Sequence, residues 1–167
     1  MQNKKIGYVA IQFTPETNQE IIAWSQSIKK EDLVTAIIDG GTEGGNVTDK
    51  LHLTLFYGFN DELLNKVELS KFINKIKLRE IKIRGLGFFP VGNHNCDVLH
   101  LQIKDDNGEL RKIHEELKAF PHFSEDQKFE YTPHVTIAYV KKNFNLNTLI
   151  QNQPEMLRVR KTSYILS

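Results

Sequence analysis

The chain has 167 residues, a length that predicts one domain, residues 1–167, with a core large enough to fold alone. Hydrophobic residues make up 40% and charged residues 26%, as in ordinary soluble globular proteins. The net charge of +1 excludes a strong overall field for long duplex nucleic acid or an acidic membrane surface. An anionic substrate would therefore have to be held by a local site.

The sequence also indicates a compartment. Cys96 is the only cysteine, which excludes an internal disulfide and favours a reducing environment. Residues 1–5 are polar and lack the apolar segment of a signal peptide, and no apolar run approaches the roughly 18 residues of a membrane span. We therefore expect a cytoplasmic protein that is a monomer and has no membrane partner.

Hydrophobic periodicity predicts strands and helices along the whole chain. Strands are predicted over residues 6–13, 33–38, 52–58, 80–89, 98–103, 134–140 and 156–166. Helices are predicted over residues 15–30, 60–77, 109–120 and 146–152. The first helix has a typical start, with Thr14 as its cap and Pro15 in its first position. Residues 39–46 hold four glycines and are predicted to form a flexible loop.

This order of elements predicts an α+β fold with mostly antiparallel pairing. Each half of the chain contains a strand, then a helix, then a strand that begins with histidine. We therefore predict a bilobal fold of two mostly antiparallel sheets in a pseudo-twofold arrangement around a central cleft. The helices are expected on the outer faces.

Two stretches share one pattern, HLTLFY at residues 52–57 and HVTIAY at residues 134–139. We call them the first motif and the second motif. Both read His, aliphatic, Thr, aliphatic, variable, Tyr. Because side chains in a strand alternate between its two faces, each His shares a face with its Thr, and the aliphatic residues line the other face. Each motif is therefore predicted to present an imidazole beside a hydroxyl.

Paired motifs of this kind suit phosphate chemistry. One neutral imidazole can accept a proton from a nucleophile while the other, protonated, protonates the leaving oxygen. Threonine hydroxyls can donate hydrogen bonds to the non-bridging oxygens of the phosphate. The candidate catalytic residues are His52, Thr54, His134 and Thr136. No third ligand or carboxylate cluster lies near either motif in the sequence, so we expect no metal and no other cofactor.

HLTLFYG and TPHVTIAY resemble the paired H-x-T/S-x motifs of the 2H phosphoesterase superfamily, which includes the so-called 2′-5′ RNA ligases (LigT), cyclic phosphodiesterases and phage-encoded members. Weaker likenesses lie in residues 8–13, in GLGFFP at residues 85–90, and in residues 110–120. LigT-type members often carry Arg where this chain has Tyr139, and the motif forms look closer to the phage-type proteins. The resemblance places His52, Thr54, His134 and Thr136 in the catalytic positions.

The resemblance implies a bilobal α+β fold and a metal-independent phosphodiesterase. Its expected partner is a small nucleotide or oligonucleotide substrate: a 2′,3′-cyclic phosphate, a 2′-5′-linked oligonucleotide or a cyclic oligonucleotide. Some phage-type relatives destroy the cyclic oligonucleotide signals of bacterial CBASS immunity. Two alternatives remain open: an RNA-end-processing 2′,3′-cyclic phosphodiesterase or 2′-5′ RNA ligase-like enzyme, and a module that binds nucleotides without turnover.

Four further residues are candidates for substrate binding. Tyr8 is expected on an open strand face and could stack on a base, or be a half-buried strand tyrosine. By alternation Phe56 shares a strand face with His52, where it would form the floor of the site or pack at its rim. His100 points away from the packed face of its strand, toward the cleft or toward solvent. Lys141 follows the second motif and would attract phosphate or be a surface lysine.

The remaining motif tyrosine and histidines are predicted to play no part in the site. By strand alternation Tyr139 lies opposite His134 and is expected in the core. His94, His114 and His122 are expected to be exposed.

Overall fold

The computed structural model describes residues 3–38, 41–47, 51–91 and 96–167. Its strands are β1 (Ile6–Phe13), β2 (Thr35–Ile38), β3 (Gly41–Gly44), β4 (His52–Asn60), β5 (Glu80–Pro90), β6 (Cys96–Ile103), β7 (His134–Lys141) and β8 (Met156–Leu166). Its α-helices are α1 (Pro15–Ser25), α2 (Lys66–Asn74), α3 (Glu109–Leu117) and α4 (Asn147–Ile150). The α+β class is therefore confirmed.

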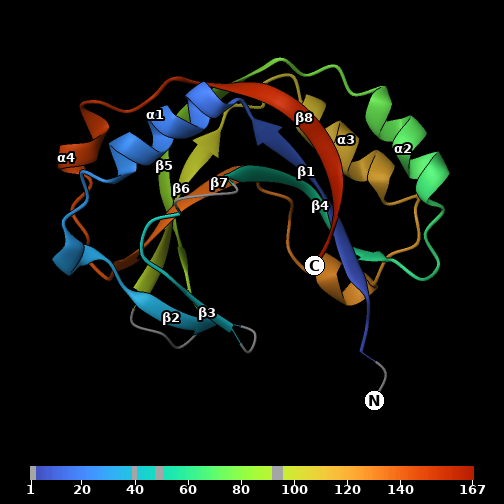
Figure 1. The fold of residues 1–167 in the computed structure, drawn as a ribbon, viewed down its shortest axis with the longest axis horizontal. Coiled ribbons are helices and arrows are strands. Elements are labelled where there is room, and N and C mark those ends of the chain that lie inside the picture. The colour runs from blue at the N-terminus through green and yellow to red at the C-terminus, as the bar shows by residue number, and fades with distance from the viewer. Residues whose placement is uncertain (1–2, 39–40, 48–50, 92–95) are drawn as a thin grey trace.

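Six of these strands form one strongly curved antiparallel sheet in the order β4-β1-β8-β5-β6-β7, shown as an arch in Figure 1, and β2 and β3 form a separate hairpin. The two three-stranded halves are joined where residues 80–82 of β5 pair with residues 156–158 of β8, and backbone hydrogen bonds from Ile83 to Glu155 and from Val159 to Arg79 extend this joint by one residue at each end. The prediction of two separate sheets is thus corrected to one sheet with a short central joint. The predicted pseudo-twofold relation between the halves stays a prediction.

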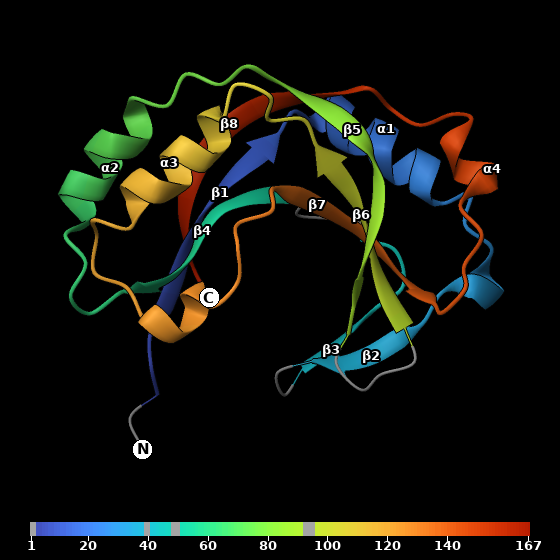
Figure 2. The same cartoon turned by 180° about the vertical axis from the view of Figure 1, so that it is seen from behind.

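The helices cover the outside of the arch, and two of them cross between its halves (Figures 1 and 2). Helix α1 follows β1 but packs against β7, whereas α3 follows β6 but packs against β4. The Trp24 indole of α1 donates a hydrogen bond of 3.1 Å to the carbonyl of Leu149 in α4, which ties α1 to the outside of the second half. Each half is therefore covered by a helix that begins in the other.

Two predicted elements differ in the structure. The glycine-rich segment was expected to be a flexible loop, but residues 41–44 form β3, which pairs with β2; Asp39 and Gly40 lie outside the described residues. The helix expected over residues 60–77 begins only at Lys66, because β4 continues to Asn60 and the Asn65 side chain caps the helix by accepting from Glu68 N–H. The other predicted strands and helices are present with shifted ends.

The backbone just before and just after β2 and β3 extends the sheet beyond β7. Val34 N–H donates to the carbonyl of Tyr139, at 2.9 Å, and Tyr139 N–H donates to the carbonyl of Gly45, at 3.0 Å. Val47 N–H donates to the carbonyl of Ile137, at 2.9 Å. The outer edge of β7 is therefore occupied by the chain on both sides of the β2–β3 hairpin.

Gly58 allows a neighbouring segment to lie directly on β4. Its φ of +110° is one that residues with side chains rarely adopt, and a Cβ at this position would lie 2.7 Å from Cβ of Asp126. The Gly58 carbonyl accepts a hydrogen bond of 2.8 Å from Phe123 N–H. Asp126 belongs to a short 3-10 helix, Ser124–Gln127, so Gly58 sets how closely this helix approaches the sheet.

We therefore expect Gly58→Ala to lower the free energy of unfolding by roughly 1–3 kcal/mol, because it combines a strained φ with a steric clash. Urea unfolding measures the change. Gly85→Ala is the matched control: a Cβ there would make an ordinary contact of 3.5 Å with the Gln102 side chain, and its φ is not positive. The expectation fails if both variants lose the same stability.

Candidate active site

The arch brings the two motifs together. β4 and β7 stand at opposite ends of the strand order, yet they contact each other because the sheet curves back on itself (Figure 2). His52 begins β4 and pairs with Gln12 of β1; His134 begins β7 and pairs with Gln102 of β6. The two motif histidines thus occupy matching positions in the two halves.

Each motif strand contains an extra residue at the same offset; β4 has a second one, Gly58, beyond the motif. In β4 Leu55 is skipped by the pairing, since Ala10 pairs with Thr54 and Val9 with Phe56. In β7 Ile137 is skipped, since His100 pairs with Thr136 and Leu99 with Ala138. Such a β-bulge places two successive side chains on one face and reverses the alternation beyond it. The third and sixth residues of each motif therefore share a face.

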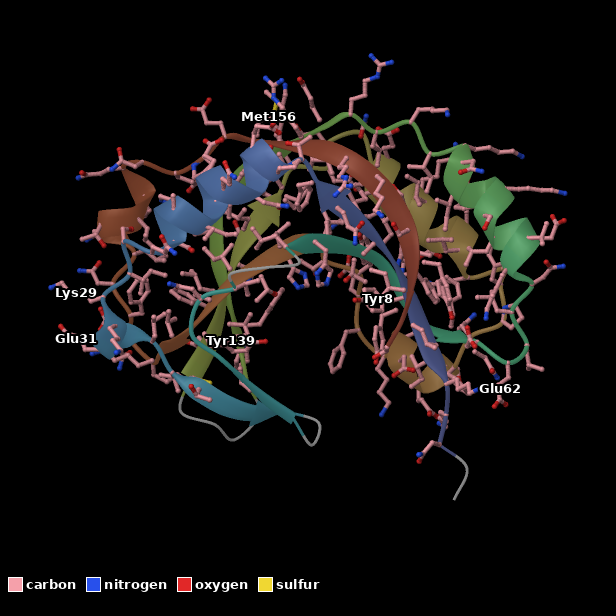
Figure 3. The ribbon with its side chains drawn as sticks, viewed as in Figure 1. Tyr8, Lys29, Glu31, Glu62, Tyr139 and Met156 are labelled. Atoms are coloured by element: carbon pink, nitrogen blue, oxygen red, sulfur yellow. The ribbon has the colours of Figure 1, made fainter. Side chains whose placement is uncertain are left out.

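The bulges correct two predictions. Phe56 does not share the His52 face: it is 1% exposed and packs on the Phe59 ring, whose centroid is 4.6 Å away. Tyr57 takes the open position instead, with 42% of its surface exposed. Tyr139, expected in the core, is only partly buried and lies on the concave side of the sheet, as does Tyr8 (Figure 3).

Tyr8 lies beside the first motif. Its ring centroid is 5.7 Å from that of His52 and 6.0 Å from that of Tyr57. Burial raises the pKa of the Tyr8 phenol, with a further contribution from Tyr57, so the hydroxyl keeps its proton at neutral pH. Tyr8 is thus placed where a ligand held by the first motif would meet it.

The His134 ring is held in one orientation. Its Nδ1 lies 2.8 Å from the carbonyl oxygen of Thr132, and Nδ1–H can donate a hydrogen bond to that oxygen. In the neutral ring this bond leaves the lone pair on Nε2. Burial lowers the pKa of His134, the bond to Thr132 opposes this, and positive charge on His52 lowers it further. The His134 imidazole is therefore close enough to the first motif to be affected by charge on His52.

His100 supports His134 from the neighbouring strand. It is 3% exposed, its ring stacks on Phe89 at 4.0 Å, and its centroid lies 5.3 Å from that of His134. Burial lowers the pKa of His100 to about 4, with a smaller contribution from His134, so the ring is neutral at pH 7. His100 is thus buried beneath the second motif, and the alternative of a solvated histidine is wrong.

A cavity of about 580 Å³, which we call the cleft, is lined by residues of both motifs, although His52 and Thr136 are not among its lining residues. Thr54 and His134, one from each motif, both line it. Most of its other lining residues are aromatic or belong to the segment between α3 and β7: Phe56, Tyr57, Phe89, Pro90, His114, Asp126, Gln127, Phe129, Glu130, Tyr131 and Thr132. A second cavity of about 420 Å³ lies on the other side of Phe89 and includes Arg84, His100 and Arg111.

The structure does not bring Lys141 to this cleft. Lys141 ends β7 and forms an ion pair of 2.8 Å with Asp32. His94 lies outside the described residues. His122 is partly buried, with Nδ1 2.8 Å from the Phe120 carbonyl, and His114 is almost completely buried. The prediction that these last two are exposed is therefore wrong.

Most residues that line the cleft were not predicted, among them Tyr57, Phe89, His114 and Tyr131. Two of these four had a signal in the sequence. A tyrosine at the same offset in both motifs indicates a shared role, and His114 follows Leu110 by four residues, which places it on the buried face of α3. Phe89 lies in GLGFFP, a segment whose likeness to the family does not mark it as a cleft residue, and Tyr131 stands in no pattern that marks it.

Two checks concern other kinds of site. Among the described residues, no group of three or more His, Cys, Asp or Glu side chains is arranged to hold a metal ion. Across the same residues, no helix has both the length and the apolar character needed to cross a membrane.

Stability should depend on pH through His100. Its pKa is about 4 in the folded protein, against about 6.5 for an unperturbed histidine. The unfolded chain therefore binds more protons between these values. Stability is full above about pH 6.5 and is lost as pH falls toward 4, by on the order of 2–3 kcal/mol. Urea unfolding between pH 7.5 and 4.5 measures this loss. His100→Phe, which keeps the ring on Phe89, should reduce it; parallel curves would contradict the assignment.

The chain matches known proteins in sequence and in fold. The sequence profile of the 2′-5′ RNA ligase superfamily matches residues 46–157. E. coli LigT complexed with 3′-AMP has a TM-score of 0.59 at 16% identity, covering 99% of this chain and 89% of that chain. E. coli LigT complexed with NADP+ has a TM-score of 0.62 at 16% identity with the same coverage. Kluyveromyces marxianus Usb1 has a TM-score of 0.50 at 10% identity, covering 98% and 94%. No curated protein matches the sequence.

The matched residues make up more than half of the chain and include both motifs, and the solved structures share its curved α+β architecture. These findings confirm the resemblance to the 2H phosphoesterases. The chain belongs to the 2′-5′ RNA ligase superfamily.

Proposed function

We propose that this protein is a metal-independent phosphodiesterase that cleaves a phosphodiester bond in a small nucleotide or oligonucleotide. The observation that carries the proposal is the meeting of the two motif strands at one aromatic cleft, with Thr54 and His134 both in its lining. Because charge on His52 affects the pKa of His134, the two imidazoles are near enough to divide acid and base roles around one phosphorus atom.

In this proposal His134 is the base and His52 the acid. Burial favours the neutral form of His134, and its bond to the Thr132 carbonyl leaves Nε2 free to accept a proton. Nε2 takes the proton of a water or hydroxyl nucleophile as its oxygen bonds to phosphorus. The bond from phosphorus to the leaving oxygen breaks, and protonated His52 gives that oxygen its proton. Both histidines then return to their starting forms by exchange of protons with solvent.

The two threonines would stabilise the charge on phosphorus. Thr54 and Thr136 follow the motif histidines by two residues, on the same strand faces. Their hydroxyls can donate to the non-bridging oxygens, which carry more negative charge in the five-coordinate transition state than in the substrate.

The aromatic surface of the cleft supports a nucleotide as the ligand. Phe89, Tyr131 and the highly exposed Phe129 line it, and its volume of about 580 Å³ suits a small ligand. Bases stack on such rings with little regard to sequence. Tyr8 and Tyr57 extend this surface beside His52. E. coli LigT structures with 3′-AMP and NADP+ support a small nucleotide as ligand class.

Three substrate types fit this description: a 2′,3′-cyclic phosphate, a 2′-5′-linked oligonucleotide and a cyclic oligonucleotide of the kind used in CBASS signalling. A product-resolved panel of cyclic mononucleotides, linear 2′-5′ and 3′-5′ oligonucleotides, and cyclic di- and trinucleotides ranks them. Release of a linear product from a cyclic oligonucleotide would favour the anti-CBASS role. Activity confined to 2′,3′-cyclic ends would favour RNA-end processing.

We expect cleavage to persist in excess EDTA and to fall by at least about 100-fold in both His52→Ala and His134→Ala, because each variant removes one proton-transfer group. Initial rates on the best panel substrate measure the effect. His122→Ala, which removes a histidine outside both motifs, serves as the control. Loss of activity in EDTA with survival of the two motif variants would refute the mechanism, and tight binding without any product would make the protein a binding module.

The pH dependence of kcat/KM should also reflect the lowered pKa of His134. A base must be unprotonated, so kcat/KM should decline on the acidic side only as pH falls through a value below the usual 6.5 of histidine. The acid produces a second decline on the alkaline side, giving a bell-shaped profile. Circular dichroism at each pH separates loss of activity from unfolding. A flat kcat/KM profile from pH 5 to 9 would argue against two acid–base histidines.

A further inference from the structure

Two buried or partly buried side chains hold the bulge of the first motif. The Tyr131 hydroxyl donates a hydrogen bond of 2.8 Å to the carbonyl of Thr54. His114 Nδ1 lies 2.7 Å from the carbonyl of the next residue, Leu55, and donates to it as Nδ1–H. The two rings stack on each other almost in parallel, with centroids 4.2 Å apart and planes 4° apart. We call these two residues the bulge clamp.

The clamp exists because of the bulge. In a regular strand successive carbonyls point to opposite edges, so two neighbouring carbonyls are not bound from one side. Leu55 is the extra residue of the bulge and has no partner in β1. Its carbonyl therefore needs a donor from elsewhere, and His114 supplies it.

At the second motif, the carbonyl of the extra residue is bound by a backbone N–H group instead of a side chain. The carbonyl of Ile137, the extra residue of β7, accepts from Val47 N–H. Among the described residues, side chains thus bind the carbonyls at the bulge of the first motif, and the backbone binds the one at the bulge of the second. This difference makes the bulge clamp a feature that can be tested by substitution.

The clamp also links the two motifs. Tyr131 lies three residues before His134, in the segment whose Thr132 carbonyl orients the His134 ring. His114 comes from α3, the helix that packs against β4. A bond from Tyr131 to the Thr54 backbone therefore fixes the first motif relative to the segment that orients the second.

We propose that His114 and Tyr131 are positioning residues that set the place of the Thr54 hydroxyl relative to His134. The inference rests on the proposed function, because it assumes that Thr54 binds the phosphate. Neither residue exchanges a proton with the substrate: each acts through the backbone of Thr54 and Leu55. A shift of this hydroxyl by a fraction of an ångström weakens its bond to the phosphate in the transition state.

The test is a double-mutant cycle between Tyr131→Phe and Thr54→Ala. Tyr131→Phe keeps the stacked ring and its wall of the cleft but removes the bond to the Thr54 carbonyl. We expect kcat to fall on the order of 10-fold, with KM changed less than about 2-fold. In the Thr54→Ala background, Tyr131→Phe should lower kcat by less than about 2-fold, because the hydroxyl that Tyr131 positions is already absent.

Tyr164→Phe is the matched control. The Tyr164 hydroxyl donates a bond of 2.6 Å to Asp61, and neither residue lines the cleft. We expect its kcat within about 2-fold of wild type at a temperature where all variants are folded. His114→Phe, which keeps the stack but loses the bond to Leu55, should lower kcat as Tyr131→Phe does.

Equal losses from Tyr131→Phe with and without Thr54 would overturn the proposal, as would an equal loss from Tyr164→Phe. If the wild type cleaved no panel substrate, the proposed function itself would fail. The clamp is then judged by the affinity for inorganic phosphate in an NMR titration. Tyr131→Phe should weaken that affinity in the wild type but not in Thr54→Ala, and an unchanged affinity in the wild type would overturn the proposal.

Discussion

One extra residue in each motif strand determines what the concave side of the sheet presents. Without the bulges, alternation would place His and Thr on one face and the sixth-position tyrosine on the other. Leu55 and Ile137 are skipped in the pairing, which reverses the alternation after the threonine. The skipped residue of each motif and the apolar residue after it, Phe56 or Ala138, stay in the core, and Tyr57 and Tyr139 join the open face.

The arch depends on contacts that cross between its halves. The sheet itself is joined at its centre by the short pairing of residues 79–83 with residues 155–159, so strand pairing alone gives little resistance to opening. Helix α1 packs on β7 and α3 on β4, and the buried apolar side chains of both halves form one continuous cluster. Opening the cleft would expose part of that cluster to water, which the hydrophobic effect opposes.

The sequence predicts the strands and the motif pairing well, because period two and a repeated H-x-T pattern are local signals. It predicts the single sheet poorly, because the short β5–β8 joint involves residues far apart in the chain. The face of Phe56 was predicted wrongly because the bulge reverses the alternation before it. The extra residue is a leucine, Leu55, and not a glycine that would have indicated a bulge in the sequence. His114 was misplaced because a polar residue on an apolar helix face suggests solvent unless its acceptor, a strand carbonyl, is known.

The two motifs are nearly equal in sequence, yet their surroundings differ because different residues face them. Ala10 pairs with Thr54 in the first half, whereas His100 pairs with Thr136 in the second. The larger side chain stacks on Phe89 beneath His134 and buries that imidazole, which lowers its pKa. His52 has Tyr8 beside it instead. The burial that favours the neutral form of His134 thus comes from residues outside the motif, on β5 and β6, so in the proposed mechanism the partner strands, more than the motif, would suit this histidine to the role of base.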